Sequence, residues 1–403
     1  MFPKRLVHGL FAPRRLSVWL VAICTLFLFY HLTVARIPGS AYDDTTPRFL
    51  YRSSFRDNPD FAYERNLSIA LQGIEQAVLA QNGGDDVAED QIWQIAKDAD
   101  HRGSDSISLE QANSGWKYSV MTDDQAMEFV TKILSAVPDI ADAYLSYPYY
   151  VLRTDLLRYL LIWYYGGFYA DMDVFPAKSM RSCPDLQPIF ADEAQKHAKV
   201  SLVVGVELDE PYASLRTMRN WKWTRRYGFM QYIMYAPRRF SPLLREIIVR
   251  AIAHTKELND NHKNLFTGRP RYNEATILGV TGPDVVTDAI LDVLSITLPS
   301  THDLVNKSME KDAGIDGLAS ETTGDTERRV TWAPFHHLRE SLCVDASEGT
   351  DETSMGGLCV LPVNAWGNGQ RHSGSQGYEN PHACLNHRFG GSWKKGLWQK
   401  IFG

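Results

Sequence analysis

The chain has 403 residues, 44% of them hydrophobic, so it can bury one large core or two modest ones. Its formal net charge is −6 and its pI is near 6.1, so no overall positive field favours nucleic acid as a partner. The sequence contains neither a Cys-x-x-Cys pair typical of zinc sites nor a Walker-type phosphate loop. Composition therefore excludes a nucleic-acid-binding protein and favours a large folded domain.

A hydrophobic run near the N-terminus, Leu16–Ala35, is long enough to cross a bilayer as a helix. A helix rises ~1.5 Å per residue and a hydrocarbon core is roughly 30 Å thick. Basic residues dominate positions 1–15, whereas Arg36 is followed by acidic residues, so the positive-inside rule predicts a cytoplasmic tail and a lumenal remainder. A cleaved signal peptide is the alternative. The length of the run and the lack of an A-x-A site favour an uncleaved signal anchor of a single-pass type II membrane protein.

Residues 36–85 are predicted to form a stem between the membrane and a lumenal catalytic domain, residues 86–403. The first part of this segment is polar, contains several prolines and has no sustained periodicity. Its second part, Leu67–Ala80, has apolar residues at helical spacing and predicts a helix. Two sequons, at Asn66 and Asn306, are usable for glycosylation only if this side of the membrane is lumenal.

The catalytic domain is predicted to have an α/β fold with a mainly parallel sheet. Ile92–Gln94 and Trp116–Met121 have the composition of strands, and Asp124–Ile133 predicts a helix that ends before Pro138. Strands that alternate with helices indicate parallel pairing, and ligands of such sheets bind at the carboxyl ends of the strands. The polar, glycine-rich segment Ser308–Arg329 predicts a mobile surface insertion.

The segment Arg153–Asp173, with the sequence RTDLLRYLLIWYYGGFYADMD, carries most of the chemical information. Asp155 and Arg158 are three residues apart on a predicted buried helix, so they share one face. Gly166 and Gly167 are expected to end this helix, because glycine adopts positive φ without strain. A short strand then follows, and alternation along it directs Asp171 and Asp173 to the same side.

Two carboxylates at the end of a strand form a hard oxygen site suited to Mg²⁺ or Mn²⁺ with a bound diphosphate. This is the DxD motif of nucleotide-sugar-dependent glycosyltransferases. A bare D-x-D is weak evidence, but D-x-x-R-Y followed at this offset by G-G-x-Y-x-D-x-D is far more specific. The alternative is a surface turn with two solvated aspartates after a core helix.

These motifs, with others in the same order, make the chain similar to the fungal Golgi alpha-1,6-mannosyltransferases of glycosyltransferase family 32, the initiation-specific enzyme and its mannan polymerase paralogue. The resemblance extends from about Gln91 to Lys395, with a gap of divergent, polar sequence near Ser308–Arg329. It implies a GT-A-type nucleotide-sugar-binding domain with an attached acceptor-binding half. The segments that carry it, besides the DxD region, are Ile92–Gln94, Trp116–Asp124, Val203–Asp209, Val280–Ile290, Val360–Trp366 and His387–Lys394.

The resemblance implies a retaining alpha-1,6-mannosyltransferase that transfers mannose from GDP-mannose to an oligomannose glycan acceptor. It implies a role in protein N-linked glycosylation and mannan biosynthesis, a location in the Golgi membrane and participation in a Golgi mannosyltransferase complex. One alternative is mannosylation of inositol phosphorylceramide. The sequence after Gly391 has no additional hydrophobic span of the kind found in that branch. A second alternative is a non-catalytic subunit, but both DxD aspartates are present.

For the metal, we assign Asp173 as the direct ligand and Asp171 to the ribose or to a metal-bound water. The resemblance implies both roles but not which aspartate takes which. His387 is the expected third ligand, and an imidazole ligand favours Mn²⁺ over Mg²⁺ as the cofactor. The alternative for this histidine is a structural role. Trp393 and Lys394 are expected to contact the diphosphate, because an indole N–H and an ammonium both reach phosphate oxygens.

For the donor, Asp155 and Arg158 resemble the pair with which DxD glycosyltransferases hold the sugar. A structural ion pair is the alternative, but a buried pair adds little net stability. Four other residues are expected near the ligands. Trp93 and Gln94 are expected at the nucleobase, Gly282 at a backbone turn beside the donor, and Glu207 near the acceptor hydroxyl. Trp93 as an ordinary core residue is a close alternative.

Cys24 lies in the hydrophobic run, which leaves four cysteines for the rest of the chain. Four cysteines allow three pairings, among which the sequence cannot choose. A local disulfide between Cys343 and Cys359, which flank an acidic segment, is the favoured pairing. Free buried thiols at these four positions, including Cys183 and Cys384, are the alternative.

Overall fold

The computed structural model describes residues 23–25, 53–100, 102–194, 200–263, 270, 272–312, 322–323, 326–327, 330–350 and 355–390. Residues 47–403 form one compact unit, which contains all the elements discussed below. The predicted signal anchor, residues 16–35, lies outside the described residues except for positions 23–25. Within the described ranges, no helix combines the length and apolar character that a membrane span requires.

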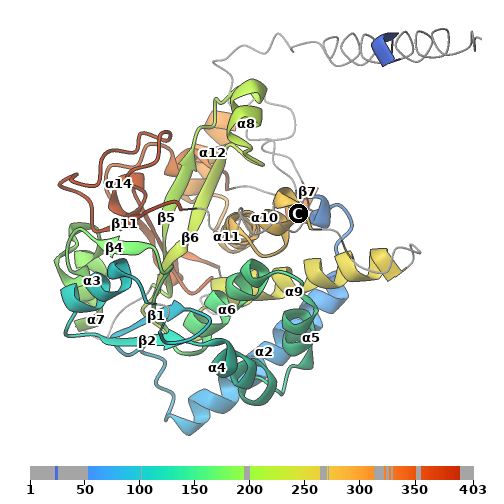
Figure 1. The fold of residues 1–403 in the computed structure, drawn as a ribbon. Helices are drawn as coiled ribbons and strands as arrows, with labels where there is room; N and C mark the ends of the chain where they lie inside the picture. The colour runs from blue at the N-terminus through green and yellow to red at the C-terminus, as the bar shows by residue number, and fades with distance from the viewer. Residues whose placement is uncertain are drawn as a thin grey trace, which may run out of the picture. The chain divides into compact units, whose positions relative to one another are not determined.

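Helices and strands alternate through most of this unit, as Figure 1 shows. The helices of more than one turn are α2 (Phe61–Gln81), α3 (Ser104–Ala112), α4 (Asp123–Glu128), α5 (Pro138–Ser146), α6 (Tyr150–Tyr164), α7 (Gln187–Ala194), α8 (Leu215–Trp221), α9 (Pro242–Lys263), α10 (Glu274–Val280), α11 (Pro283–Thr297) and α12 (Asp303–Asp312). The short α14 comprises Val363–Trp366, and a π-helix, Phe129–Ile133, continues from α4.

The strands are short and fall into one large sheet and two small ones. Their bounds are β1 (Gln91–Ile95), β2 (Lys117–Met121), β3 (Gly167–Ala170), β4 (Val174–Pro176), β5 (Leu202–Asp209), β6 (Tyr227–Ala236), β7 (Thr322–Thr323), β8 (Thr326–Glu327), β9 (Leu342–Val344), β10 (Leu358–Leu361) and β11 (Leu385–His387). The strands and the helix predicted near residues 92, 116 and 124 are therefore confirmed as β1, β2 and α4.

The large sheet has seven strands in the order β2-β1-β3-β6-β5-β10-β9. The pairs β2–β1, β1–β3 and β5–β10 are parallel, and the other three neighbouring pairs are antiparallel. Five strands therefore run in one direction, and β6 and β9 run against them. The prediction of an α/β domain is confirmed, with the refinement that the sheet is mixed because β6 lies antiparallel beside β3.

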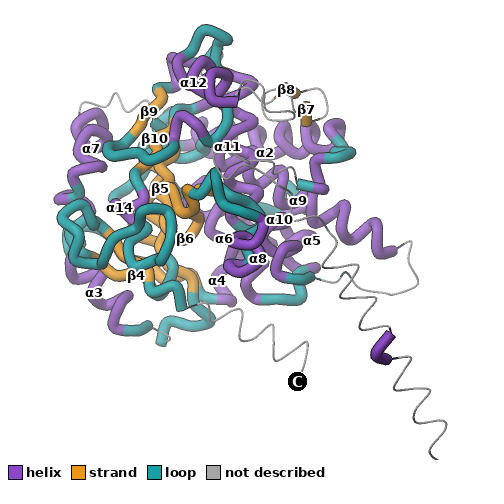
Figure 2. Tube along the Cα trace, turned by 90° about the horizontal axis from the view of Figure 1, so that it is seen from above, coloured by secondary structure: helices purple, strands orange, loops and turns teal. Residues whose placement is uncertain are grey.

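Two hydrophobic cores cover the two faces of this sheet, because successive side chains of a strand point to opposite faces. Phe168 and Val203 contribute to the core on the side of α3, α7 and α14, whereas Tyr169 and Val204 contribute to the core on the side of α2, α6, α9 and α11. Figures 1 and 2 show the strands between these two groups of helices. The unit is thus a three-layer arrangement in which strands such as β3 are buried on both faces.

Helix α2 belongs to the folded unit rather than to a stem. Leu67, Leu71 and Ile74 are buried in the core on the α9 side. Glu75 accepts hydrogen bonds from the indole of Trp163 at 2.9 Å and from Arg245 at 2.6 Å. The predicted helix is confirmed and is longer than expected, but the stem boundary predicted at residue 85 has to move to a position before this helix.

The Gly166–Gly167 break ends α6 and begins β3, as the sequence predicts. Both residues have positive φ, 70° and 88°. A Cβ on Gly167 would lie 2.5 Å from the carbonyl oxygen of Gln91, so only glycine lets β3 approach β1 this closely. The two glycines thus set the distance between the end of α6, the strand β3 and the residues that follow it.

Two disulfides are present in the described unit. Cys343–Cys359 joins the adjacent strands β9 and β10, which confirms the favoured local pairing. Cys183–Cys384 joins positions 201 residues apart and fixes the segment that leads into β11. Cys24, in the hydrophobic run, is free and exposed.

Candidate active site

The turn that carries Asp171 and Asp173 lies between β3 and β4, at the carboxyl end of β3. The backbone of Asp171 is fixed on two sides. Its N–H donates to the carbonyl of Tyr232 on β6 at 2.9 Å, and its carbonyl accepts from the side chain of Gln94 on β1 at 2.8 Å. The turn is therefore held by the two strands that flank β3, and both aspartates line the same cavity.

His387 reaches this turn from the far end of the chain. Strand β11 pairs antiparallel with β4, with His387 opposite Val174. Nε2 of His387 lies 2.9 Å from Oδ1 of Asp173, and the imidazole stacks on Tyr232 with ring centroids 4.2 Å apart. The potential ligand atoms of Asp171, Asp173 and His387 all lie within 4.8 Å of one another. The three predicted ligands thus come together.

The chemistry of these groups fits a divalent ion such as Mn²⁺, which accepts both carboxylate and imidazole ligands. Although burial raises the pKa of Asp173, its hydrogen bond with His387 lowers the pKa below its ordinary value, which favours the ionised form a metal needs. Nδ1 of His387 is buried and has no hydrogen-bond partner among the described residues. The hydrogen bonds of the protein alone therefore leave this imidazole incompletely satisfied.

Asp155 and Arg158 form a buried ion pair on α6, beside the aspartate turn. Nη2 of Arg158 lies 2.9 Å from Oδ1 of Asp155, and the two side chains are only 5% and 2% exposed. The same nitrogen lies 3.4 Å from Oδ1 of Asp171. One guanidinium therefore links the helical carboxylate to the DxD motif, which a purely intrahelical ion pair would not do.

Three residues that the sequence analysis did not select complete this network. Gln231 on β6 donates to Asp155 at 3.3 Å, and the hydroxyl of Thr281 donates to the other carboxylate oxygen at 3.1 Å. The hydroxyl of Tyr169 donates to Asp171 at 2.6 Å. Gln231 could have been found as the one amide within the apolar run YGFMQYIMYA, because a polar residue in a buried strand needs a reason.

Burial shapes the electrostatics of this network. It raises the pKa of Asp155 to about 7, despite the opposing effect of Arg158. Burial alone would lower the pKa of Arg158, but Asp171, Tyr169 and Asp155 raise it above its ordinary value, so the guanidinium stays charged. Asp155 can therefore accept or donate a hydrogen bond near neutral pH. A strongly shifted carboxyl in a cavity is typical of functional sites.

These groups open into a cavity of about 300 Å³, named here the DxD cavity. Five of the predicted site residues line it, Asp155, Arg158, Asp171, Asp173 and His387, together with Glu207, which the sequence assigned to the acceptor. The remaining lining residues are Val151, Gln231, Tyr232, Ile277, Leu278, Pro283 and Phe389.

The predicted nucleobase contacts are placed differently. The indole of Trp93 packs against Tyr165, with centroids 5.1 Å apart, and donates to the carbonyl of Gly166 at 3.1 Å. Gln94 is fully buried and holds Asp171. Neither residue lines the DxD cavity, so Gln94 acts as a positioning residue, and contact of Trp93 with a base stays a prediction.

Packing explains why residue 282 is a glycine, because a Cβ there would lie 2.6 Å from Cα of Leu278 on α10. It allows α10 and α11 to approach, and its neighbours Thr281 and Pro283 face the site. Trp393 and Lys394, the predicted diphosphate contacts, lie outside the described residues.

Two other groups of potential metal ligands in the described residues are less suited to holding a metal ion. Asp209 lies beside His336 and His337, but its two oxygens already accept from the ring of His336 at 2.6 Å and the backbone N–H of His337 at 2.8 Å. Asp185 lies beside Cys183 and Cys384, whose sulfur atoms are joined in a disulfide. The DxD–His387 group has the better metal chemistry.

Comparison with known proteins agrees with this site. Residues 104–195 match the family described as glycosyltransferase sugar-binding region containing DXD motif. The chain is 27% identical over 286 residues to the initiation-specific alpha-1,6-mannosyltransferase of Candida albicans, an alignment covering 71% of this chain and 65% of that relative. Less than two thirds of that relative's length is thus matched.

The enzyme of the same name from Saccharomyces cerevisiae is 24% identical over 376 residues, covering 76% of this chain and 77% of the relative. The putative glycosyltransferase HOC1 of Saccharomyces cerevisiae is 28% identical over 232 residues, covering 57% of this chain and 48% of that relative.

A carboxylate pair at a strand end, a histidine beside it and a charged helical pair in the same cavity define the class as a DxD glycosyltransferase. The family match places the DxD motif within a sugar-binding region, consistent with this geometry. The chain is thus similar to the initiation-specific alpha-1,6-mannosyltransferases over most of its length, in agreement with the resemblance that its sequence motifs indicated.

Proposed function

We propose that this protein is a retaining alpha-1,6-mannosyltransferase that transfers mannose from GDP-mannose to an oligomannose acceptor. The observation that carries this proposal is the convergence of Asp171, Asp173, His387 and the Asp155–Arg158 pair on one cavity. The names of the relatives support the mannose specificity and the linkage. A GT-A-type arrangement of the α/β domain is part of the same proposal.

Asp171, Asp173 and His387 would hold Mn²⁺, or Mg²⁺ in its place. A bound divalent ion supplies charge stabilisation for a leaving diphosphate without proton transfer. Arg158 adds a fixed positive charge next to Asp171. Because Arg158 is itself held by Asp155, its position is set before substrate arrives, which is the condition for effective electrostatic stabilisation.

Asp155 would orient the donor sugar by hydrogen bonds to its hydroxyls. Its two oxygens are already fixed by Gln231, Thr281 and Arg158, so the carboxyl presents a defined geometry toward the cavity. The hydroxyl of Tyr232, in the cavity wall, is buried and has no hydrogen-bond partner within the described part of the chain. A sugar hydroxyl is a suitable partner for it.

The cellular setting is proposed on sequence grounds. The hydrophobic run Leu16–Ala35 and the basic residues before it support a type II Golgi membrane protein with a lumenal catalytic domain. Two disulfides within the catalytic unit agree with an oxidising compartment. Asn66 and Asn306 are exposed and so are accessible for glycosylation. A Golgi mannosyltransferase complex is the proposed assembly.

The test is transfer itself. The purified full-length protein is incubated with GDP-mannose, Mn²⁺ and defined oligomannose acceptors, and the linkage of each product is mapped. We expect a single added mannose in alpha-1,6 linkage. Transfer to inositol phosphorylceramide instead would replace the proposal with the alternative named above, although similarity to inositol phosphoceramide mannosyltransferase 1 of Schizosaccharomyces pombe covers only 67 residues. No transfer from any nucleotide sugar would indicate a non-catalytic subunit.

A further inference from the structure

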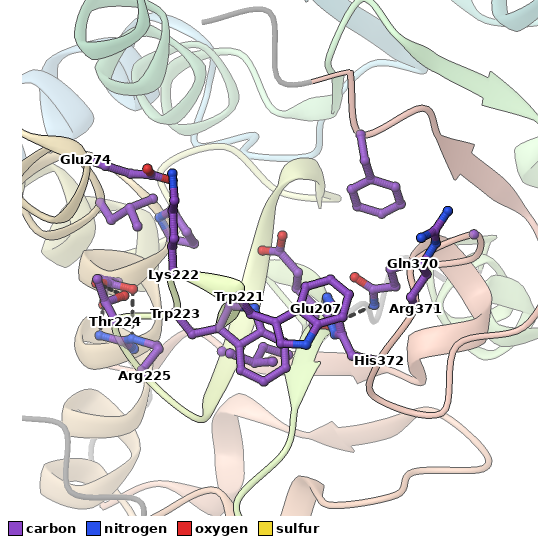
Figure 3. A pocket seen from close by; sticks show the side chains of 17 residues that line it. Glu207, Trp221, Lys222, Trp223, Thr224, Arg225, Glu274, Gln370, Arg371 and His372 are labelled. Carbon is purple, nitrogen blue, oxygen red and sulfur yellow. Dashed lines mark hydrogen bonds and ion pairs between the residues drawn. The ribbon is translucent and has the colours of Figure 1, made fainter. Parts of the chain in front are cut away.

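A second and larger cavity, of about 510 Å³, lies next to the DxD cavity. The two cavities share four lining residues, Glu207, Leu278, Pro283 and Phe389. Figure 3 shows this second cavity, with Glu207 near the middle of its lining residues. A molecule bound here can therefore extend past Glu207 to the groups that surround the DxD motif. None of the roles assigned so far uses the remainder of this cavity.

An aromatic surface forms one wall of the second cavity. Trp221, the last residue of α8, stacks on Trp223 with ring centroids 5.5 Å apart and planes at 17°. His372 meets both indoles edge-on, at 5.3 and 4.8 Å. Lys222 between them adopts a left-handed conformation, with φ of 58°, which lets both indoles turn to the same side. These three rings are named here the aromatic wall.

Trp221 is the exposed member of the aromatic wall, and Trp223 and His372 are partly buried. Trp221 is 42% exposed, an unusual state for the largest apolar side chain, and it is not needed to fill a core. Large flat side chains with a polar edge are favoured where a ligand presents both apolar C–H faces and hydroxyl groups. Sugar rings have this composition.

The charges of the second cavity are balanced. Three basic residues, Lys222, Arg225 and Arg371, line it together with three acidic residues, Glu207, Glu274 and Asp284. Burial lowers the pKa of His372 to about 4, so its imidazole is neutral near pH 7. The DxD cavity offers a group of potential metal ligands through which a diphosphate could be held, whereas the balanced charged groups of the second cavity can pair with the hydroxyls of a neutral ligand. The balance therefore favours a neutral polyhydroxy compound.

The floor and rim of the cavity are rigid. Arg225 on the floor pairs with Asp284 at 2.8 Å and with Asp288 at 3.3 Å, and all three side chains are about 3% exposed. On the rim, Gln370 donates to the backbone carbonyl of Glu207 at 2.8 Å. This bond ties the loop that carries His372 to the residue shared by both cavities. A wall fixed in advance loses less entropy when a ligand binds.

We propose that the second cavity is the acceptor subsite, in which the aromatic wall stacks on a mannose unit of a neutral oligosaccharide while Glu207 faces the acceptor hydroxyl. This proposal rests on the proposed function for the identity of the sugar. It assigns specificity for the acceptor to Trp221, Trp223 and His372. Their segments are separate from the DxD motif in sequence.

The proposal is tested with Trp221→Ala, because an exposed indole can be removed with little effect on the core. Losing one stacking surface is expected to raise KM for the oligomannose acceptor ~10-fold. The KM for GDP-mannose, the Mn²⁺ requirement and the slow hydrolysis of GDP-mannose without acceptor should not change. Trp221→Phe keeps a ring and should restore most of the loss. Leu215→Ala, which removes another exposed apolar side chain from α8, is the matched control.

Two results would overturn the proposal. If Trp221→Ala raises KM for GDP-mannose and leaves that for the acceptor unchanged, the aromatic wall binds the nucleotide. If neither KM changes in a variant with normal thermal stability, the wall binds no substrate.

Calorimetric titration with the free oligosaccharide separates this proposal from the proposed function. Suppose that the wild type binds the oligosaccharide and that Trp221→Ala binds it more weakly, but that neither protein transfers mannose from GDP-mannose. The donor assignment is then wrong, and the assignment of the acceptor subsite is still supported.

Discussion

The two adjoining cavities differ in the kinds of side chain that line them. In the DxD cavity, buried charges fix one another, as in the network of Asp155, Arg158 and Asp171. In the second cavity, an exposed and a partly buried indole stack beside a balanced set of charged side chains. The first arrangement suits a charged donor whose diphosphate must be stabilised in a defined geometry. The second suits a neutral ligand that binds through the faces of its sugar rings. Stacking of this kind tolerates several conformations of an oligosaccharide.

The difference extends to how strongly each site depends on single residues. A buried ion pair that loses one partner leaves an uncompensated charge, so substitutions in the DxD cavity should have large effects. Loss of one stacking ring removes contact area and leaves no charge behind, so substitutions in the second cavity should have modest effects. The predictions below test this contrast, beginning with the largest expected effect.

Asp173→Ala should abolish transfer and leave the fold intact. The residue is half-buried in the cavity, and its carboxylate is one of three groups that converge as potential metal ligands. Loss of such an electrostatic stabiliser is expected to lower kcat by roughly 10²–10³ or more. Initial rates with GDP-mannose and oligomannose measure this effect, and Asp90→Ala, which removes a carboxylate from an exposed ion pair, is the control. Turnover like that of the wild type in folded Asp173→Ala protein would remove the DxD assignment.

Arg158→Ala and Asp155→Asn should differ sharply in stability. Removing the guanidinium leaves Asp155 buried without its cation, which should lower the free energy of unfolding by about 3–5 kcal/mol. Asp155→Asn should cost much less, because Arg158 keeps Asp171 at 3.4 Å as a counterion. Burial raises the pKa of Asp155 to about 7. The wild type therefore loses stability as pH rises from the ordinary carboxyl pKa toward 7, whereas Asp155→Asn does not titrate and has no such loss at this position. Urea titrations at pH 7.5 measure both variants. Equal losses would contradict the network as described.

The two disulfides should affect the two cavities unequally. Cys183–Cys384 closes a span of 201 residues and fixes the chain just before His387, whereas Cys343–Cys359 closes a span of 16 at the far edge of the sheet. Replacing Cys183 and Cys384 by serine should lower stability by about 5 kcal/mol and raise the Mn²⁺ requirement. Replacing Cys343 and Cys359 should cost about 3 kcal/mol and leave that requirement unchanged. Thermal unfolding and Mn²⁺ titrations check both pairs, and a common Mn²⁺ response would contradict the assignment.

His387→Ala should weaken the response to Mn²⁺ more than it weakens folding. Its imidazole lines the DxD cavity and lies 2.9 Å from Asp173, so its removal should affect the metal site more than the hydrophobic core. The Mn²⁺ concentration for half-maximal activity should rise about 10–100-fold, the range seen when groups that orient a metal site are lost. Activity is measured against Mn²⁺ at one pH, with thermal unfolding in parallel. A normal Mn²⁺ curve together with a lower melting temperature would make His387 structural.

The DxD cavity could largely be predicted from sequence because its chemistry is local. Asp155, Arg158, Asp171 and Asp173 fall within one helix–strand unit, and their spacing specifies a shared face and a strand end. His387 lies more than two hundred residues away. It could be proposed only from its resemblance to the family, since no spacing rule connects β11 with β4.

The second cavity could not be predicted in this way. Its lining residues come from β5, the end of α8, the helices α10 and α11 and the loop before β11, and only the fold brings them together. Trp221 and Trp223 are ordinary aromatic residues in the sequence, which does not distinguish a stacked pair that lines a cavity from a pair of core residues. The same reasoning explains Trp93. A tryptophan in a buried strand was equally compatible with a base contact and with the packing against Tyr165 that the structure has.

The wall shared by both cavities offers the last test, with the smallest expected effect on substrate binding. His254 on α9 is buried, stacks on Phe55 and donates from Nδ1 to the carbonyl of Gly279 on α10, next to Leu278, which lines both cavities. Burial lowers the pKa of His254 to about 3. The folded protein therefore keeps this imidazole neutral in a range where the unfolded chain binds a proton.

Since the unfolded state binds more protons there, stability should fall as pH drops from about 6.5 toward 3, by at most about 1.4 kcal/mol per pH unit from this group. His254→Asn does not titrate, so its free energy of unfolding should depend less steeply on pH than that of the wild type. Denaturant titrations between pH 4 and 7 measure the two slopes. If His254 supports the shared wall, the variant should also raise both substrate KM values slightly and together, unlike Trp221→Ala, which should affect only the acceptor. Identical slopes in the two proteins would mean that His254 is not kept neutral by burial.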